Sequence, residues 1–136
     1  MCGHCFVTDK EIEVEELPWG PHEWLSRPGL TAAEKLLVVR VKMPAGKAHE
    51  FHRHPECEEV LYILEGQAEQ WVGEKKQILK KGEIAHIPTD VVHGTYNITE
   101  ETCTFIAILS PAKTEGPLLI DVSQEEPWKS MRNSET

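Results

Sequence analysis

The 136-residue chain contains no apolar run that approaches the roughly 18 to 20 residues needed to span a bilayer. Its first residues, MCGHCFVTDKEIEVEEL, also lack the basic and apolar regions of a secretory signal. Basic side chains are scarce, with 14 Lys and Arg against 23 Asp and Glu and a formal net charge of -9. Because a surface of this sign repels phosphate groups, we expect no nucleic-acid or membrane partner. The composition therefore favours a cytoplasmic protein whose partner is a small molecule.

Cysteine is also rare, and four are present: Cys2, Cys5, Cys57 and Cys103. In a cytosolic protein we expect them to be reduced thiols. Cys2 and Cys5 form a C-x-x-C pair, whose redox chemistry needs a preceding strand and a helix N-terminus to lower the thiol pKa. Since the neighbouring residues indicate neither element, we interpret the pair as part of a frayed terminus. The alternative is an adventitious metal or redox contact.

Long helices are excluded from the N-terminal region by three prolines: Pro18, Pro21 and Pro28. We expect residues 1–34 to form an extended arm that packs onto the rest of the domain or onto a partner subunit. Trp19 and Trp24 would make these contacts, whereas His22 is interpreted as a surface residue.

Between residues 35 and 122, short segments rich in β-branched and aromatic residues alternate with turn residues. This rhythm predicts an all-β single domain, built as an antiparallel sandwich or barrel. The expected strands include 59–64, 68–72, 77–79, 84–87, 91–98 and 103–109, and residues 118–122 form either a late strand or an arm. Residues 123–136 are polar, so we expect a loose tail that Trp128 anchors.

Histidines are concentrated in residues 46–66, GKAHEFHRHPECEEVLYILEG. His52 and His54 are two residues apart, so in an extended strand their side chains point to the same face. With a carboxylate from the following strand they would form half of a metal site. His93, behind a turn that contains Pro88, is the candidate for the other half. Three neutral imidazoles and a carboxylate suit Fe, Mn, Co, Ni, Cu or Zn better than Mg or Ca, so the expected cofactor is one divalent transition metal ion.

These two segments resemble the paired motifs of the cupin family. The first motif is Gly, five residues, His-x-His, three or four residues, Glu, six residues and Gly; its positions here are Gly46, His52, His54, Glu59 and Gly66. The second is Gly, five residues, Pro-x-Gly, two residues, His, three residues and Asn; its positions are Gly82, Pro88, His93 and Asn97. Asp90 stands where the family has Gly, and Asp tolerates the left-handed backbone of such a turn.

The resemblance implies a small antiparallel β-barrel of jelly-roll topology over residues 35–122. It also implies four metal ligands: His52, His54, Glu59 and His93. Glu58 is the competing carboxylate, but the six-residue gap to Gly66 selects Glu59, and adjacent residues of a strand face opposite ways. The alternative is a cupin that keeps the motif without binding a metal.

Strand parity orients the residues around these ligands. Leu61 and Ile63 are expected inside the barrel and Tyr62 outside it. Arg53 should face away from the histidines that flank it, and Lys47 should be solvated. An apolar-walled pocket of this kind suits a small neutral or chelating ligand.

Other residues carry weaker signals. His49 is interpreted as exposed rather than at the pocket mouth, His86 as a surface or subunit-contact residue, and Cys57 as buried rather than reactive. Four further residues are candidates for the pocket, although one sequence does not set their orientation: Gln70, Trp71, Tyr96 and Phe105.

The resemblance implies a metal-dependent enzyme that acts on a small chelating or carbonyl/enol-type substrate, of the dioxygenase, isomerase or decarboxylase type. A non-catalytic module that binds a small ligand or senses a metal is the alternative, because cupins serve many activities. A homodimer is also expected, with the Trp-rich arm and the outward apolar residues of 60–64 at the interface.

Overall fold

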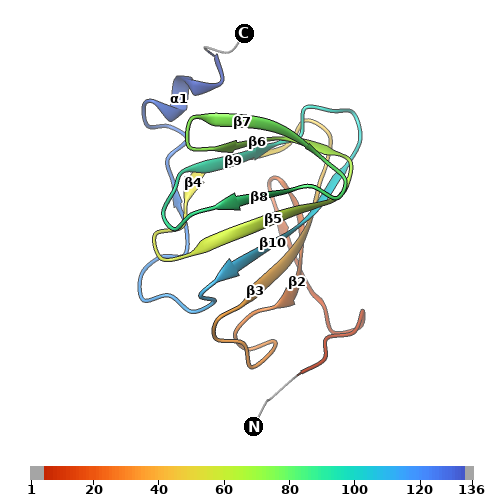
Figure 1. Cartoon of the computed structure of the whole chain (residues 1–136). Helices are drawn as coiled ribbons and strands as arrows, with labels where there is room; N and C mark the ends of the chain where they lie inside the picture. The colour runs from red at the N-terminus through yellow and green to blue at the C-terminus, as the bar shows by residue number, and fades with distance from the viewer. Residues whose placement is uncertain (1–4, 134–136) are drawn as a thin grey trace.

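Figure 1 shows the computed structural model of the chain, which describes residues 5–133. Within this range the strands pair in an antiparallel manner and form two sheets that face each other. The six-stranded sheet has the order β1 (Glu13–Leu17), β2 (Gly20–Ser26), β3 (Leu37–Met43), β10 (Cys103–Ser110), β5 (Glu58–Glu65) and β8 (Ile84–Ile87). The five-stranded sheet has the order β11 (Ile120–Asp121), β4 (Ala48–Arg53), β9 (His93–Tyr96), β6 (Gln67–Val72) and β7 (Lys75–Lys80). No helix among the described residues is long and apolar enough to cross a membrane.

The core between the sheets follows from alternation along the strands. In β3 and β10 every second residue is buried and those between are partly or fully exposed. Leu37, Val39 and Val41 of β3 therefore meet Phe105 and Leu109 of β10 on one inner face. Burying a side chain of this size contributes about 1.5 to 3 kcal/mol. The expected all-β, antiparallel jelly roll is confirmed.

The expected closed barrel is not observed. β7 is the edge strand of one sheet and β8 the edge strand of the other, and the described strands are not hydrogen-bonded across this edge. The reason lies in the pairing, because β7 bonds to β6 while β8 bonds to β5, which belong to different sheets. The fold is thus an open sandwich.

The N-terminal region differs from the expected extended arm. Residues 13–26 form a hairpin, β1–β2, that extends the six-stranded sheet by pairing with β3. Gly20 begins β2 with a φ of +124°, and a side chain there would collide with the carbonyl oxygen of Lys42. The prolines are accommodated because Pro18 occupies the turn and Pro21 lies next to it. Trp19 and Trp24 pack against the core, as expected.

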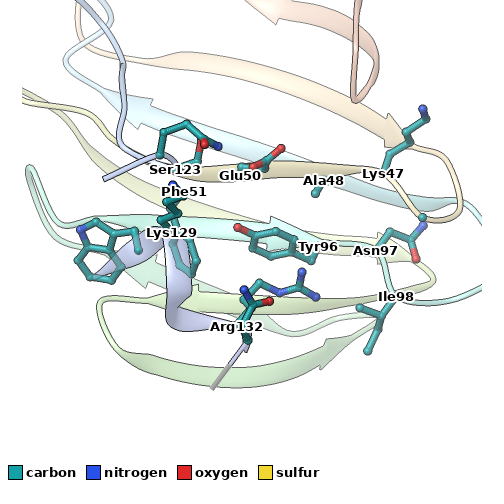
Figure 2. Close-up of a pocket in the computed structure, with 14 residues that line it drawn as sticks. Lys47, Ala48, Glu50, Phe51, Tyr96, Asn97, Ile98, Ser123, Lys129 and Arg132 are labelled. Atoms are coloured by element: carbon teal, nitrogen blue, oxygen red, sulfur yellow. The ribbon is translucent and has the colours of Figure 1, made fainter. Parts of the chain in front are cut away.

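The C-terminal segment is also more ordered than the expected loose tail. It ends in the short helix α1 (Trp128–Met131), whose Trp128 and Met131 pack on an aromatic cluster of the five-stranded sheet. Figure 2 shows this outer face, where Arg132 lies beside Tyr96. The Arg132 guanidinium carbon lies 3.9 Å from the centre of the Tyr96 ring, and its nitrogens lie 2.8 and 3.0 Å from the carboxylate of Glu69. The tail covers apolar surface that the sheet alone would leave in water.

The cysteines differ in whether the structure describes them and in how they are bonded. Cys2, half of the C-x-x-C pair, lies outside the described residues. Cys5 is disulfide-bonded, so the expectation of reduced thiols is wrong at this position. Cys57 and Cys103 are free thiols, as expected, and both are buried. Burial raises the pKa of the Cys103 thiol to about 11, so it stays protonated at neutral pH.

Candidate metal centre

Three histidines meet between the sheets. His52 of β4 and His93 of β9 are direct cross-strand partners, and His54 follows the end of β4. All three are buried, and one ring nitrogen from each lies within 4.8 Å of the other two. This is the grouping that a metal ion requires, and it joins the two motifs that are about 40 residues apart in the sequence.

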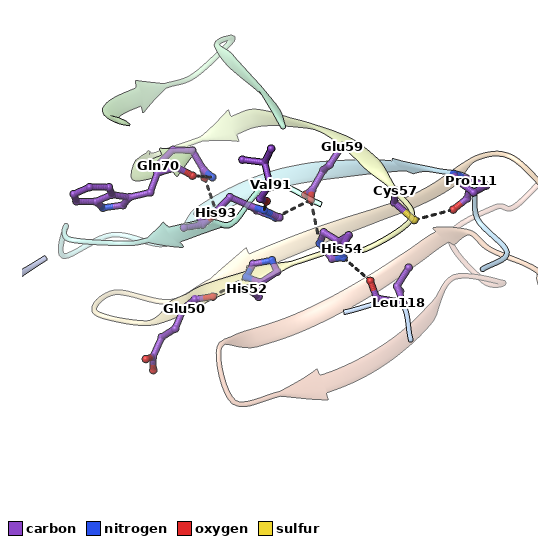
Figure 3. A network of polar contacts seen from close by, with 12 residues as sticks. Glu50, His52, His54, Cys57, Glu59, Gln70, Val91, His93, Pro111 and Leu118 are labelled. Atoms are coloured by element: carbon purple, nitrogen blue, oxygen red, sulfur yellow. Dashed lines mark hydrogen bonds and ion pairs between the residues drawn. The ribbon is translucent and has the colours of Figure 1, made fainter. Parts of the chain in front are cut away.

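Backbone carbonyls set the orientation of each ring. Nδ1 of His52 donates a hydrogen bond to the oxygen of Glu50 (2.6 Å), and Nδ1 of His54 donates to that of Leu118 (2.9 Å). His93 Nδ1 donates to the oxygen of Val91 at 2.9 Å. Because a carbonyl only accepts, Nδ1 carries the proton and Nε2 keeps a free lone pair in the neutral ring. Figure 3 shows the three rings with their backbone partners Glu50, Leu118 and Val91. The Nε2 lone pairs are not used by these backbone contacts and could bind a cation.

Glu59 completes the cluster from β5. Its Oε1 atom lies 3.2 Å from His54 Nε2 and 3.1 Å from His93 Nε2. Among the described residues, Glu59 Oε1 and His93 Nε2 are buried atoms without a hydrogen-bond partner. A carboxylate oxygen that faces imidazole lone pairs is unfavourable unless a proton or a cation lies between them. The donor atoms present therefore fit a metal ion.

The adjacent glutamate points the other way, as strand parity predicts. Glu58 is exposed and lies 2.9 Å from Nε2 of His86 on the outer face of the same sheet. His86 is thus the surface residue that we expected. The sequence alone was sufficient for this prediction, because buried and more exposed residues alternate along β5 without interruption from Glu58 to Ile63.

The charge states in the cluster follow from burial and from mutual contact. Burial lowers the pKa of His52 well below its usual value, so this ring is neutral at neutral pH. Burial acts to raise the pKa of the Glu59 carboxyl, but its close contacts and charge interactions with His54 and His93 outweigh it and hold the pKa well below its usual range. Conversely, burial acts to lower the pKa of His54, but the Glu59 carboxylate raises it. The cluster is built around one ionised carboxylate.

A β-bulge in β4 shapes the site. The β4–β9 register shifts between His49 and His52, so that Glu50 and Phe51 together occupy the space opposite Gly94. His49 therefore faces inward with His52, although only two residues, Glu50 and Phe51, lie between them. A side chain at Gly94 would approach the backbone nitrogen of Phe51 to 3.3 Å and the oxygen of His49 to 3.4 Å. The absence of a side chain at Gly94 leaves room for the bulge.

The cluster opens into a cavity of about 140 Å³ between the sheets. Its walls are mostly apolar, and no Lys or Arg is among the described residues that line it. The wall residues other than the four polar cluster members are Leu17, Trp19, His22, Trp24, Leu37, Val39, Val41, His49, Leu61, Thr95, Phe105, Ala107, Leu109, Leu118 and Leu119.

Two histidines that line the cavity, His22 and His49, were expected at the protein surface. His22, predicted at the surface, is only 3% exposed, because β2 turns it toward the sandwich interior. His49, predicted to be exposed, is stacked between Trp19 and His52 with ring centres 3.7 and 3.6 Å apart. The alternating burial of Gly20 and His22 in β2 could have been suspected from strand parity. The bulge that turns His49 inward has no local signal.

The remaining pocket candidates separate by face. Phe105 and Leu61 line the cavity. Gln70 is buried behind it and accepts a hydrogen bond from the Thr95 hydroxyl at 2.6 Å. Trp71 and Tyr96 pack on the opposite face of their sheet, in the cluster under α1. Their strands β6 and β9 alternate, so neighbours in sequence serve different faces.

Three further expectations about single residues are confirmed. Asp90 adopts a left-handed backbone with φ of 65°, as its place in the second motif requires. Arg53 points away from the cluster and pairs with Asp90 at 2.8 Å. Cys57 is buried, and its thiol donates a hydrogen bond to the oxygen of Pro111 at 3.2 Å.

An open antiparallel jelly roll with a buried three-histidine cluster defines a cupin-type sandwich. The sequence model of the cupin domain matches residues 39–109, more than half of the chain. The chain therefore belongs to the cupin family.

Curated relatives are distant. The uncharacterized protein MJ1618 of Methanocaldococcus jannaschii is 31% identical over 74 residues, which are 54% of this chain and 59% of that protein. The polyketide synthase CurC of Streptomyces cyaneus is 29% identical over 121 residues, 89% of this chain and 78% of the other. The pectin degradation protein KdgF of Dickeya dadantii is 26% identical over 110 residues, 81% of this chain and 96% of the other.

Solved structures share the fold at low identity. KdgF from Halomonas sp. superposes with a TM-score of 0.70 at 19% identity, covering 82% of this chain and 97% of that one. The oxalate decarboxylase of Lactobacillus farciminis gives a TM-score of 0.73 at 20% identity, covering 85% of this chain but 35% of that one. The chain thus spans about a third of the oxalate decarboxylase.

Proposed function

We propose that the protein is a metal-dependent enzyme that acts on a small, neutral carbonyl or enol compound. In this proposal four residues hold one divalent transition metal ion: His52, His54, Glu59 and His93. The observation that carries it is the buried, unpaired contact between Glu59 Oε1 and His93 Nε2 at the base of an apolar cavity. Such a pair is unfavourable in the absence of a cation.

The proposed donor set favours a class of ion. Three neutral imidazole nitrogens and one carboxylate oxygen suit Fe, Mn, Co, Ni, Cu or Zn. An ion of this class, when bound, supplies Lewis-acid polarisation of an oxygen substituent or activation of dioxygen. The sandwich contributes rigidity, because the ligands come from β4 and the residue that follows it, from β5 and from β9, and the histidine rings are hydrogen-bonded to the backbone.

The size and lining of the cavity favour a small, neutral substrate. About 140 Å³ accommodates a molecule of roughly the size of benzene, since an engineered cavity of about 150 Å³ binds benzene. A dicarboxylate such as oxalate would place its second charge among apolar walls without a lysine or arginine to pair with it. A neutral substrate meets no such cost. This favours isomerase- or dioxygenase-type chemistry over decarboxylation, which needs an anionic carboxylate.

Within the cavity, Glu59 is the ionised group available to a substrate. If the Glu59 carboxylate left the metal, it could accept a proton from a C–H or O–H group beside the substrate carbonyl. The apolar residues of β3 and β10 exclude water from that position and strengthen the interaction. The chain thus supplies a base, a dry cavity and a metal-binding cluster in one place.

Elemental analysis tests the metal centre. The protein is purified without a metal-affinity column, together with His93→Ala and the matched control His86→Ala, which removes an exposed histidine. We expect near-stoichiometric first-row transition metal in the wild type and in His86→Ala, and loss of the metal in His93→Ala. Wild-type protein without metal after anaerobic reconstitution, or full retention in His93→Ala, overturns the assignment.

Turnover separates an enzyme from a binding module. Metal-loaded protein is incubated under air and under argon with neutral β-diketones and enols, and with oxalate for comparison. We expect turnover of a neutral compound and none of oxalate. Saturable binding of the neutral compounds without turnover would instead favour a non-catalytic, ligand-binding cupin.

A further inference from the structure

We propose that His22 is a specificity residue, which accepts a hydrogen bond from an O–H or N–H group of the ligand in the cavity. The inference rests on the proposed function only in taking the cavity as the substrate site. It names the ligand more narrowly, as a neutral molecule that carries a hydrogen-bond donor at the end away from the metal centre.

The N-terminal hairpin builds one wall of the cavity. Four residues of β1, β2 and the turn between them line it: Leu17, Trp19, His22 and Trp24. All four precede residues 39–109, which match the cupin domain. The metal cluster belongs to the matched region, whereas this wall lies outside it. A difference in ligand choice among cupins with the same cluster would arise at such a wall.

The hydrogen bonding of His22 leaves one ring nitrogen available. The side chain is 3% exposed, and Nδ1 donates a hydrogen bond to the carbonyl oxygen of Gly20 at 3.0 Å. In the neutral ring Nε2 is then an acceptor, and no partner for it is found among residues 5–133. Burial lowers the pKa of His22, which keeps the ring neutral at neutral pH. An acceptor on a residue that lines the cavity gains a hydrogen bond when a ligand brings a donor.

The ring is held in place before a ligand arrives. Trp19 packs its edge against His22, with ring centres 4.0 Å apart and planes at 85°. The carbonyl oxygen that Nδ1 contacts belongs to Gly20, whose backbone position other residues would not tolerate. An acceptor that is oriented in advance costs little conformational entropy on binding, which is what selectivity requires.

The hairpin is also connected to the metal cluster. Trp19 stacks on His49, and His49 stacks on His52, so three rings form a continuous wall from the hairpin to the cluster. A ligand held at the cluster therefore lies in the same small cavity as His22.

Few other polar groups compete for the ligand. The Thr95 hydroxyl already donates its proton to Gln70 at 2.6 Å, and the lining residues within 5–133 include no lysine or arginine. The cavity thus offers acceptors and apolar surface. It fits a neutral molecule with one hydroxyl or N–H group, such as an enol, a phenol or an N–H heterocycle.

The test compares phenol with toluene, which has nearly the same shape but a methyl group in place of the hydroxyl. Dissociation constants are measured by NMR titration for the wild type, His22→Leu, His22→Gln and the surface control His86→Leu. The toluene-to-phenol ratio of dissociation constants should fall about five- to tenfold in His22→Leu, the value of one net hydrogen bond. It should stay near the wild-type ratio in His86→Leu and recover in part in His22→Gln, which retains an acceptor.

A second measurement on the wild type covers the case in which His22→Leu does not fold. The ¹⁵N resonance of His22 Nε2 should shift when phenol binds and stay unchanged when toluene binds. An unchanged ratio in folded His22→Leu, or no difference between the probes in the Nε2 shift, overturns the proposal and leaves His22 a packing residue. Since neither probe requires turnover, this result is independent of the metal analysis.

Discussion

At the residue scale, two neighbouring glutamates show how strand alternation directs one side chain to the histidine cluster and the next to solvent. Glu58 pairs with an exposed histidine at the surface, and Glu59 is buried against His54 and His93. The two side chains are identical and adjacent, so their different surroundings come from strand alternation alone. They are therefore a natural pair for mutation.

Glu59→Gln should weaken metal binding about 10- to 100-fold or more, because even outer-shell partners of metal ligands have effects of this size. The substitution keeps the shape of the side chain but removes the ionised oxygen. The measurement is a Zn²⁺ titration of metal-free protein against a chromophoric chelator. Glu58→Gln should bind Zn²⁺ as the wild type does. Equal losses in the two variants would mean that Glu59 acts only through stability.

At the element scale, the two ends of the chain complete the sandwich. The β1–β2 hairpin adds two strands to one sheet and a wall to the cavity. The C-terminal segment, through α1, covers the aromatic cluster on the outer face of the other sheet. Arg132 holds this segment against the sheet, because it donates two hydrogen bonds to the carboxylate of Glu69. The Glu69 side chain is only 10% exposed.

Arg132→Gln should lower the free energy of unfolding by about 1 kcal/mol at pH 7, a modest value because the arginine is partly exposed. The hydrogen bond from Arg132 lowers the pKa of Glu69 below its ordinary value of 4.5. Its contribution to stability is therefore complete above pH 4.5 and is lost as the pH falls through the lowered pKa. The difference between wild type and variant should close in acid.

Urea unfolding at pH 7 and below pH 4.5 measures this difference, with Lys129→Gln, in the helix that precedes Arg132, as the control. The control should match the wild type at both values. A gap that persists or widens in acid would show that Arg132 stabilises the segment by its contact with Tyr96 rather than by its charge.

At the scale of the whole molecule, the outer face of the six-stranded sheet carries exposed apolar side chains. Tyr62 is 38% exposed and Ile84, its cross-strand partner, is 52% exposed. On the other side of Tyr62 lies Ile106, and Val60 pairs with Ile108 in the same way. These residues form a continuous apolar patch on a protein with a net charge of -9. We infer that a second copy of the chain covers it.

Tyr62→Glu should therefore convert a dimer into a monomer, because it places a charge in the centre of the apolar patch. Light scattering at micromolar concentration measures the mass. Val14→Glu is the control, since Val14 is exposed on β1, away from the patch in strand order. A wild type that is already monomeric would contradict the homodimer.

Local patterns determined much of this protein. The spacing of His52, His54, Glu59 and His93, the alternation within β5 and the left-handed turn at Asp90 are properties of neighbouring residues, so they could be predicted before the fold was known. The jelly-roll fold could be predicted because the same residue spacing resembles the paired motifs of the cupin family.

Only the tertiary structure decided the rest. Which sheet a strand joins depends on pairing between segments far apart in the chain, so the hairpin, the open edge between β7 and β8 and the ordered C-terminal segment were not predicted. His49 turns inward because of a bulge against Gly94, and His22 is buried because β2 pairs with β3. Strand register is a long-range property, and it set the wall of the cavity that faces the metal cluster.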